Sequence, residues 1–282
     1  MWSTKIGMML AGAVVVVSVT ALGQQKKEFR YPVTNGAMVS IVNDYGPVSV
    51  KPSSGGNVLV NTSTRSNRVE VDGNQNGNRV EVRTHYLQHV GPEDGRVDYE
   101  VQVPPDASVT VHSAVGQISA ERLVGDVTLE GESSSVQVRD FTNAHLHVRT
   151  VDGPVSLTNV RNSHVDVTSA GGDVTLSSVT GPKVYVNTTK GKIKYMGDLA
   201  GGGDYAFTNH SGDIDVAIPS TASVDVTARS VFGSVEDAFQ FRPNAHMTFV
   251  PSQGKSFAGY SNSGGASLKL HSFTGKIKVH KQ

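Results

Sequence analysis

The chain of 282 residues contains no cysteine, so no disulfide bond can staple its fold. At this length a buried core is sufficient without disulfides. Aromatic residues are scarce, at 6%, and the single tryptophan, Trp2, lies at the extreme N-terminus. This scarcity disfavours an enzyme that cleaves polysaccharides, because such enzymes usually hold sugar faces on aromatic platforms.

Net charge is also absent, since Lys plus Arg and Asp plus Glu both number 25. A nucleic-acid binder needs a basic face to neutralise phosphates, so no nucleic acid is expected as a partner. Beyond the N-terminal segment the sequence lacks the apolar periodicity of helices. It is instead rich in glycine, at 30 residues, and in valine, serine and threonine, which favours strands and turns.

The N-terminus has the pattern of a secretory signal peptide covering residues 1–23. Lys5 precedes an apolar run over 6–22, and the small residues Ala21 and Gly23 mark a cleavage site. We therefore expect an exported protein in the periplasm, outer membrane or surface of a bacterium. An uncleaved anchor is the alternative, although the run is short for a spanning helix. Contact with a membrane is expected only through such an anchor.

A glycine phrase recurs along the second half of the chain: glycine, any residue, then Val/Ile, a polar residue and an apolar one. Clear copies begin at Gly116, Gly153, Gly172, Gly191, Gly212 and Gly275. Apolar–polar–apolar triplets recur about every nine residues, and glycine precedes mostly every second one. Intervening triplets follow Asn143-Ala-His and Asn162-Ser-His instead. The repeating unit therefore has about 19 residues and two unlike strands.

This rhythm predicts an all-β fold, a β-solenoid resembling a parallel β-helix, with coils of about 19 residues and two short strands. Side chains alternate across a strand, so Val155 and Val174 are expected inside and Thr175 outside. An antiparallel β-sandwich or propeller of nine-residue strands is the alternative.

The expected organisation has four parts. The signal peptide is followed by a polar lead at 24–32 and by a β-rich start or cap of the solenoid at 33–105. A regular solenoid follows at 106–282, with an irregular, aromatic-rich excursion at 236–266.

Two longer phrases carry a family resemblance. One runs Tyr99-Glu-Val-Gln-Val-Pro-Pro-Asp-Ala-Ser-Val-Thr-Val111, and the other closes the chain as Leu268-Lys-Leu-His-Ser-Phe-Thr-Gly-Lys-Ile-Lys-Val279. Over roughly residues 33–280 the sequence resembles exported bacterial proteins of the DUF4097 type, labelled as adhesins and related to head-GIN-domain auto-transporter adhesins. The resemblance implies a β-helix-like fold at the cell envelope.

A candidate metal site lies on one predicted outer face. His145 and His147 point the same way on one strand, and a 19-residue coil would place His164 beside His145 and Asp166 beside His147. Three imidazoles and a carboxylate suit Zn²⁺ or another divalent ion. The alternative is an ordinary ladder of solvated polar side chains.

The sequence names no catalytic residue and no cofactor. It contains no G-x-S-x-G nucleophile turn, and Gly191-Lys-Ile lacks the remaining residues of a phosphate-binding loop.

The aromatic-rich excursion is the other candidate site. Its rings either cover the end of the coil stack or form an apolar patch that contacts a partner. The candidates for partner contact are Phe239, Phe241, Phe249, Phe257 and Tyr260.

These observations favour a non-enzymatic cell-envelope protein, an adhesin or an assembly scaffold, with a protein or glycan of the envelope as its partner. One alternative is a periplasmic binding module in envelope signalling that captures its partner through 236–266. Another is a divergent glycan-active enzyme.

Overall fold

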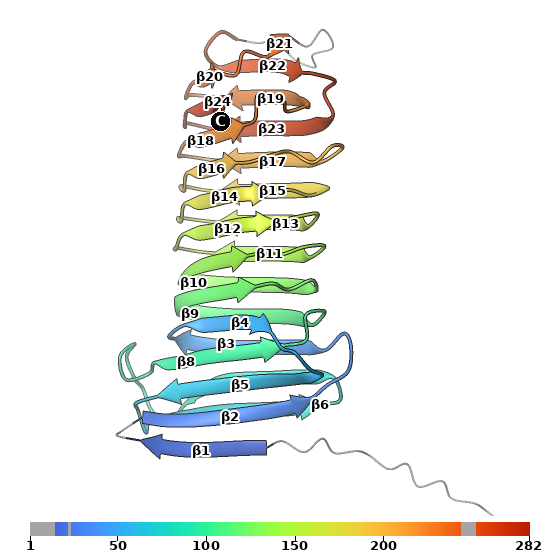
Figure 1. The fold of residues 1–282 in the computed structure, drawn as a ribbon. Coiled ribbons are helices and arrows are strands. Elements are labelled where there is room, and N and C mark those ends of the chain that lie inside the picture. The colour runs from blue at the N-terminus through green and yellow to red at the C-terminus, as the bar shows by residue number, and fades with distance from the viewer. Residues whose placement is uncertain (1–14, 22–23, 244–251) are drawn as a thin grey trace, which may run out of the picture.

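The computed structural model describes residues 15–21, 24–243 and 252–282. The chain forms an all-β column in which strands lie above one another from β1 at one end to β21 at the other (Figure 1). In these ranges no helix is both long and apolar enough to cross a membrane.

Each regular coil contributes one strand to each of two parallel stacks. β9 (Ser108–Glu121) and β10 (Asp126–Arg139) run through both stacks. The first stack continues with β11 (His145–Thr150), β13 (His164–Ser169), β15 (Lys183–Thr188) and β17 (Asp204–Asn209). The second stack continues with β12 (Val155–Val160), β14 (Val174–Val179), β16 (Ile193–Met196) and β18 (Ile214–Ile218).

The register of these pairs confirms the predicted coil length. His145 lies opposite His164 in the first stack, and Val155 lies opposite Val174 in the second, so both partners are 19 residues apart. The spacing rises to 21 residues between Val184 and Tyr205, where the insertion at 199–204 is accommodated. The parallel pairing excludes the antiparallel sandwich and the propeller for this part of the chain.

The core fills the space between the stacks with the inward residues of each triplet. Val155 is 1% exposed and Val174 is fully buried, whereas Thr175 is half-buried on the outer face. Each valine that is removed from water contributes about 1.5–3 kcal/mol. The predicted inside and outside faces are therefore confirmed.

Close packing explains the glycine corners. A Cβ on Gly172 would overlap the carbonyl oxygen of Gly153, and one on Gly191 would overlap that of Gly172. Within a coil, Ser169 Oγ donates a hydrogen bond of 3.0 Å to the carbonyl oxygen of Gly172, and Thr188 Oγ1 donates one of 2.9 Å to that of Gly191. Only a residue without a side chain fits where successive corners approach so closely.

The second corner type depends on backbone conformation. Asn143 and Asn162 have φ angles of 56° and 48°, in the left-handed region. Asparagine tolerates this region better than most residues, and the amide of Asn162 donates to the Asn143 side chain one coil below. The alternation of two corner types is therefore a physical feature of each coil.

At the N-terminal end the order of coils in space differs from their order in sequence. β3 (Met38–Tyr45) pairs with both β7 (Arg79–Tyr86) and β9, and β4 (Val48–Pro52) pairs with both β8 (Val97–Val103) and β9. The coil of β3 and β4 thus lies between the β7–β8 coil and β9. The antiparallel strands β5 (Asn57–Thr64) and β6 (Val69–Asn76) extend this end.

The segment expected as a polar lead is part of the sheet. Residues Gln24–Pro32 form β2, which pairs antiparallel with β5, and its Phe29 and Tyr31 are buried. β1 (Val15–Ala21) pairs antiparallel with β2 and lies inside the segment predicted as a signal peptide. Signal-peptide cleavage stays a prediction.

The C-terminal end shows the same kind of rearrangement. β23 (Ala266–Ser272) and β24 (Ile277–Lys281) pair with β17 and β18 on one side, and with β19 (Val224–Ser230) and β20 (Val235–Asp237) on the other. The coil that comes last in sequence is therefore an internal layer (Figure 1). Antiparallel β22 (Ser256–Ser261) and β21 (Arg242–Pro243) lie beyond β19.

Candidate functional site

The outer side of the first stack carries a concentration of imidazole and charged side chains. We call this surface the histidine face; it comprises His112, Asp126, Glu130, His145, His147, Arg149, His164 and Asp166. These residues occupy outward positions of β9, β10, β11 and β13, where side chains from successive coils form columns.

The column through His145 brings together residues that are far apart in sequence. His145 and His164 stack with ring centroids 4.9 Å apart and an angle of 28° between the ring planes. His145 Nδ1 lies 3.0 Å from Asp126 Oδ1, one coil in the other direction. The predicted adjacency of the two histidines is confirmed. Asp126 was not among the predicted site residues, although it precedes His145 by the same 19 residues.

The neighbouring column contains the rest of the predicted cluster. His147 lies opposite Asp166 in the parallel register, as expected. Ring nitrogens project in the plane of an imidazole, so two stacked rings direct their lone pairs side by side rather than toward one point. Metal binding by His145, His147, His164 and Asp166 stays a prediction, and it requires the rings to rotate.

Ion pairs continue along the face toward the N-terminal end. Glu130 forms ion pairs with two residues. Its Oε2 lies 3.8 Å from His112 Nδ1, and its Oε1 lies 3.9 Å from Arg149 Nη1. Exposed pairs of this kind contribute only about 0–1 kcal/mol to folding. The face therefore offers alternating charges at the surface without being a main source of stability.

A tighter polar contact lies where the first stack meets the inserted C-terminal coil. Tyr185 Oη donates a hydrogen bond of 2.7 Å to Asp204 Oδ2, and Lys269 Nζ donates one of 3.1 Å to Asp204 Oδ1. The tyrosine hydrogen bond and the neighbouring ammonium lower the pKa of Asp204, and partial burial opposes them. This contact joins β15, β17 and β23.

The aromatic-rich excursion packs on the end of the coil stack. Phe239 is 4% exposed and stacks on Phe241 with centroids 4.4 Å apart, and Phe241 stacks on Phe257 at 5.8 Å. Tyr260 is half-buried on β22, and Phe249 lies outside the described residues. We call Phe239, Phe241 and Phe257 the aromatic cap. Partner contact through this segment stays a prediction.

Two further rings, near this segment, remain open to solvent. Phe232 is 66% exposed and Phe273 is 38% exposed, and they meet edge to face with centroids 4.9 Å apart. Phe273 also stacks on His210 at 4.7 Å. The three residues follow β17, β19 and β23 at the glycine corner. Their grouping depends on β23 lying between β17 and β19, which the sequence does not reveal.

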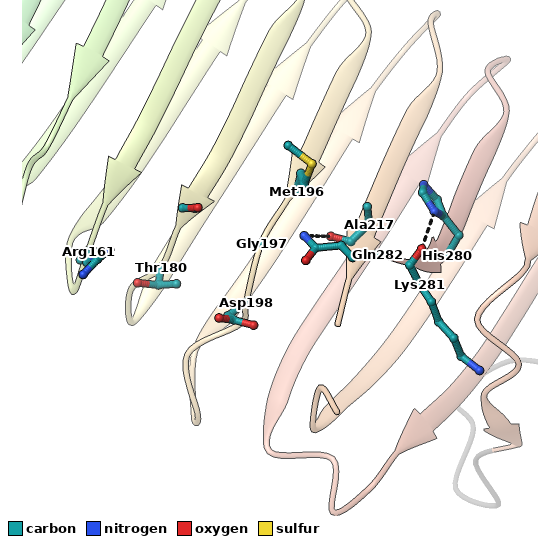
Figure 2. A pocket seen from close by; sticks show the side chains of 10 residues that line it. Arg161, Thr180, Met196, Gly197, Asp198, Ala217, His280, Lys281 and Gln282 are labelled. Carbon is teal, nitrogen blue, oxygen red and sulfur yellow. Dashed lines mark hydrogen bonds between the residues drawn. The ribbon is translucent and has the colours of Figure 1, made fainter. Parts of the chain in front are cut away.

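A shallow groove of about 940 Å³ crosses the outer side of the second stack near β24 (Figure 2). His280 Nε2 lies 3.1 Å from Asp215 Oδ1, and Gln282 Nε2 donates to the Ala217 carbonyl oxygen at 3.3 Å. Figure 2 shows Arg161 at one end and the Lys281 side chain extending away from the other lining residues. The charged groups do not converge on one point, so the groove gives no reacting constellation.

Comparisons with known proteins agree with the resemblance seen in the sequence. No curated protein matches the chain. A crystal structure of a "putative cell adhesion protein" from Clostridium sporogenes ATCC 15579 matches with a TM-score of 0.29 and 11% identity, over 91% of this chain and 100% of that one. A likeness at this level carries no argument about function. The family model described as Toastrack DUF4097 matches residues 37–280, from just before β3 into β24. The chain therefore belongs to the Toastrack DUF4097 family.

Proposed function

We propose that this protein is a non-enzymatic, exported component of the bacterial cell envelope. It is a rigid β-solenoid scaffold that presents the histidine face for adhesion or for assembly with an envelope protein or glycan. The observation that supports this proposal is the register of the first stack, which places charged side chains of successive coils in continuous columns.

Such columns suit an extended partner. Parallel strands repeat at about 4.8 Å, so a polymer or an extended segment meets an outward polar or charged side chain at regular intervals along the stack. Because the backbone beneath is fixed by pairing on both sides, little conformational entropy is lost on binding. Alternating acidic and basic side chains provide specificity through charge complementarity.

The C-terminal end of the column supports lateral binding. Antiparallel β22 and β21 lie beyond the parallel coils there, and the aromatic cap packs at the same end. An uncovered parallel edge would invite end-to-end association. A partner is therefore expected to bind along the sides of the column.

The first test is localisation of the full-length chain in the bacterium that encodes it. We expect it in an envelope fraction and, for an adhesin, accessible to protease added to intact cells. A cytoplasmic location would overturn the proposal.

The second test measures binding of the purified protein to isolated envelopes. His145→Ser, His147→Ser and Asp166→Ser together should weaken binding at least about tenfold, as expected when several interfacial polar contacts are lost. The matched control is Thr158→Ala with Ser177→Ala, two outward residues that lie opposite each other in the second stack. Equal binding by both variants would exclude the histidine face as the binding surface.

A periplasmic signalling module is the second candidate, and the exposed rings of Phe232 and Phe273 favour it. Rings of this kind serve as anchors in protein interfaces. In this case Phe232→Ser with Phe273→Ser would abolish binding while the histidine-face variant retains it, and the protein would stay in the periplasm.

A further inference from the structure

Three potential metal ligands lie together on the hairpin of β6 and β7, beyond the N-terminal end of the histidine face, since β3 separates β7 from β9. They are Glu70, Asp72 and His85, and their ligand atoms all lie within 4.8 Å of one another. Among the described residues, this is the one group of three or more acidic or histidine side chains with that property.

The hairpin register explains why the three side chains meet. Glu70 lies directly opposite His85 in the antiparallel pair, and Asp72 lies two residues along the same face as Glu70. The alternating residues Val69 and Val71 are buried, which directs both carboxylates outward. The placement is therefore set by strand pairing and not by a flexible loop.

The residue next to His85 is also fixed. Thr84 Oγ1 donates a hydrogen bond of 2.8 Å to Asn43 Oδ1 and lies 2.9 Å from Tyr99 Oη. These contacts attach β7 to β3 and β8 beneath the hairpin. The imidazole thus projects from an anchored backbone position, and only its side-chain torsions remain free.

One distance bears directly on metal coordination. His85 Nδ1 lies 3.3 Å from Asp72 Oδ2. Two ligands at about 2.0–2.1 Å from one tetrahedral ion are themselves about 3.3 Å apart. An isolated imidazole–carboxylate contact is also an ordinary ion pair, but Glu70 adds a second negative charge, which the single charge of one imidazolium does not neutralise.

We propose that Glu70, Asp72 and His85 form a binding site for a divalent first-row transition-metal ion, with Zn²⁺ as the probe. One nitrogen and two oxygen ligands suit Zn²⁺, whereas Ca²⁺ takes oxygen ligands only and gains nothing from the imidazole. Three protein ligands leave at least one coordination position for water or for a group from a partner molecule.

A positively charged side chain lies beside the three proposed ligands. Arg83 lies directly opposite Asp72 in the hairpin register, on the same outward face. Its guanidinium repels a cation at this site, so replacing it with glutamine should strengthen metal binding. A variant that binds more tightly cannot be explained by loss of folding.

The test is calorimetric titration of the full-length protein with Zn²⁺ at neutral pH, with thermal unfolding to verify that each variant is folded. We expect His85→Ala to remove one binding event or weaken it at least about tenfold. Arg83→Gln should tighten the same event several-fold. Ca²⁺ should give the same weak or absent heat with the native protein and with His85→Ala.

The matched control is His145→Ala with His164→Ala on the histidine face, which should leave the hairpin event unchanged. If this control removes the Zn²⁺ event and His85→Ala does not, the hairpin site is excluded and the histidine face is the metal site. Binding that is unchanged in both His85→Ala and Arg83→Gln would also overturn the proposal.

Discussion

The Cα of Gly172 lies so close to the carbonyl oxygen of Gly153, one coil below, that the two residues leave no space for a methyl group between them. Gly172 itself is not among the residues in the left-handed region, so alanine could adopt its backbone conformation. The requirement for glycine here is therefore one of space.

This contact predicts a selective effect of adding one carbon atom. Gly172→Ala should destabilise the protein by at least about 2 kcal/mol, because the corner must separate from the coil below. Gly201→Ala is the matched control, since a Cβ there meets no atom within 4 Å. Denaturant unfolding measures both variants, and equal stabilities would show that the corners are not closely packed.

A second prediction concerns the two faces of β14. Val174→Asp places a carboxylate in the dry core and should unfold the protein or cost several kcal/mol. Thr175→Asp, one residue later, should be nearly silent because the new carboxylate faces solvent and lies opposite Lys194. Circular dichroism and thermal unfolding compare the two; similar losses would invalidate the assignment of inside and outside.

The contact between Tyr185 and Asp204 predicts a pH dependence. The pKa of Asp204 is lowered in the folded state, chiefly by the tyrosine hydrogen bond. Its contribution to stability is thus fully present above the unfolded-state value of about 3.9 and is lost as pH falls below it.

Asp204→Asn should therefore be less stable than the native protein near pH 6, and this difference should shrink toward about pH 3. Tyr185→Phe should show part of the same loss. Urea unfolding at both pH values tests this, and a difference that does not change with pH would count against a titrating role for Asp204.

The aromatic cap gives a fourth prediction. Phe239→Ala should cost about 3 kcal/mol or more, because the ring is buried in the core cluster and stacks on Phe241. Phe232→Ala, which truncates a ring that is 66% exposed, should cost less than about 1 kcal/mol. If the Phe232 variant were the less stable of the two, the cap would not lie where the structure places it.

The sequence was informative wherever structure repeats locally. Glycine before every second triplet, with asparagine before others, predicted two corner types and hence the register that brings His145 beside His164. One corner excludes any side chain and the other needs a left-handed backbone. Each requirement selects a residue type, glycine or asparagine, that is visible in the sequence.

Long-range order was not readable in the same way. The sequence at 268–279 has the same pattern as the other coils. It therefore does not reveal that β23 and β24 lie between β17–β18 and β19–β20, which come earlier in the chain. The backbone hydrogen bonds between strands are the same whichever coil supplies the neighbouring strand. Likewise, the charged residues of β2 concealed the alternation of Phe29 and Tyr31.

The hairpin metal site shows the same limit. Glu70 and Asp72 are visible in sequence as two acidic residues on one strand face, but His85 joins them only through the exact pairing of β6 with β7. The turn between these strands is only Gly77 and Asn78, but the polar run at 72–78 offers several positions for a turn when the sequence is read alone. Only the structure selects the one that places His85 opposite Glu70.

The β23–β24 coil is last in sequence but internal in the column, and this affects how the chain folds during synthesis. During synthesis the chain emerges from its N-terminus, yet β17 and β18 receive their final neighbours only after residues 266–281 have appeared. Any earlier contact between the β17–β18 coil and the β19–β20 coil has to open again. A nascent chain that stalls before residue 266 is therefore left with two unpaired sheet edges facing each other, and chaperones or proteases have a window in which to act on it.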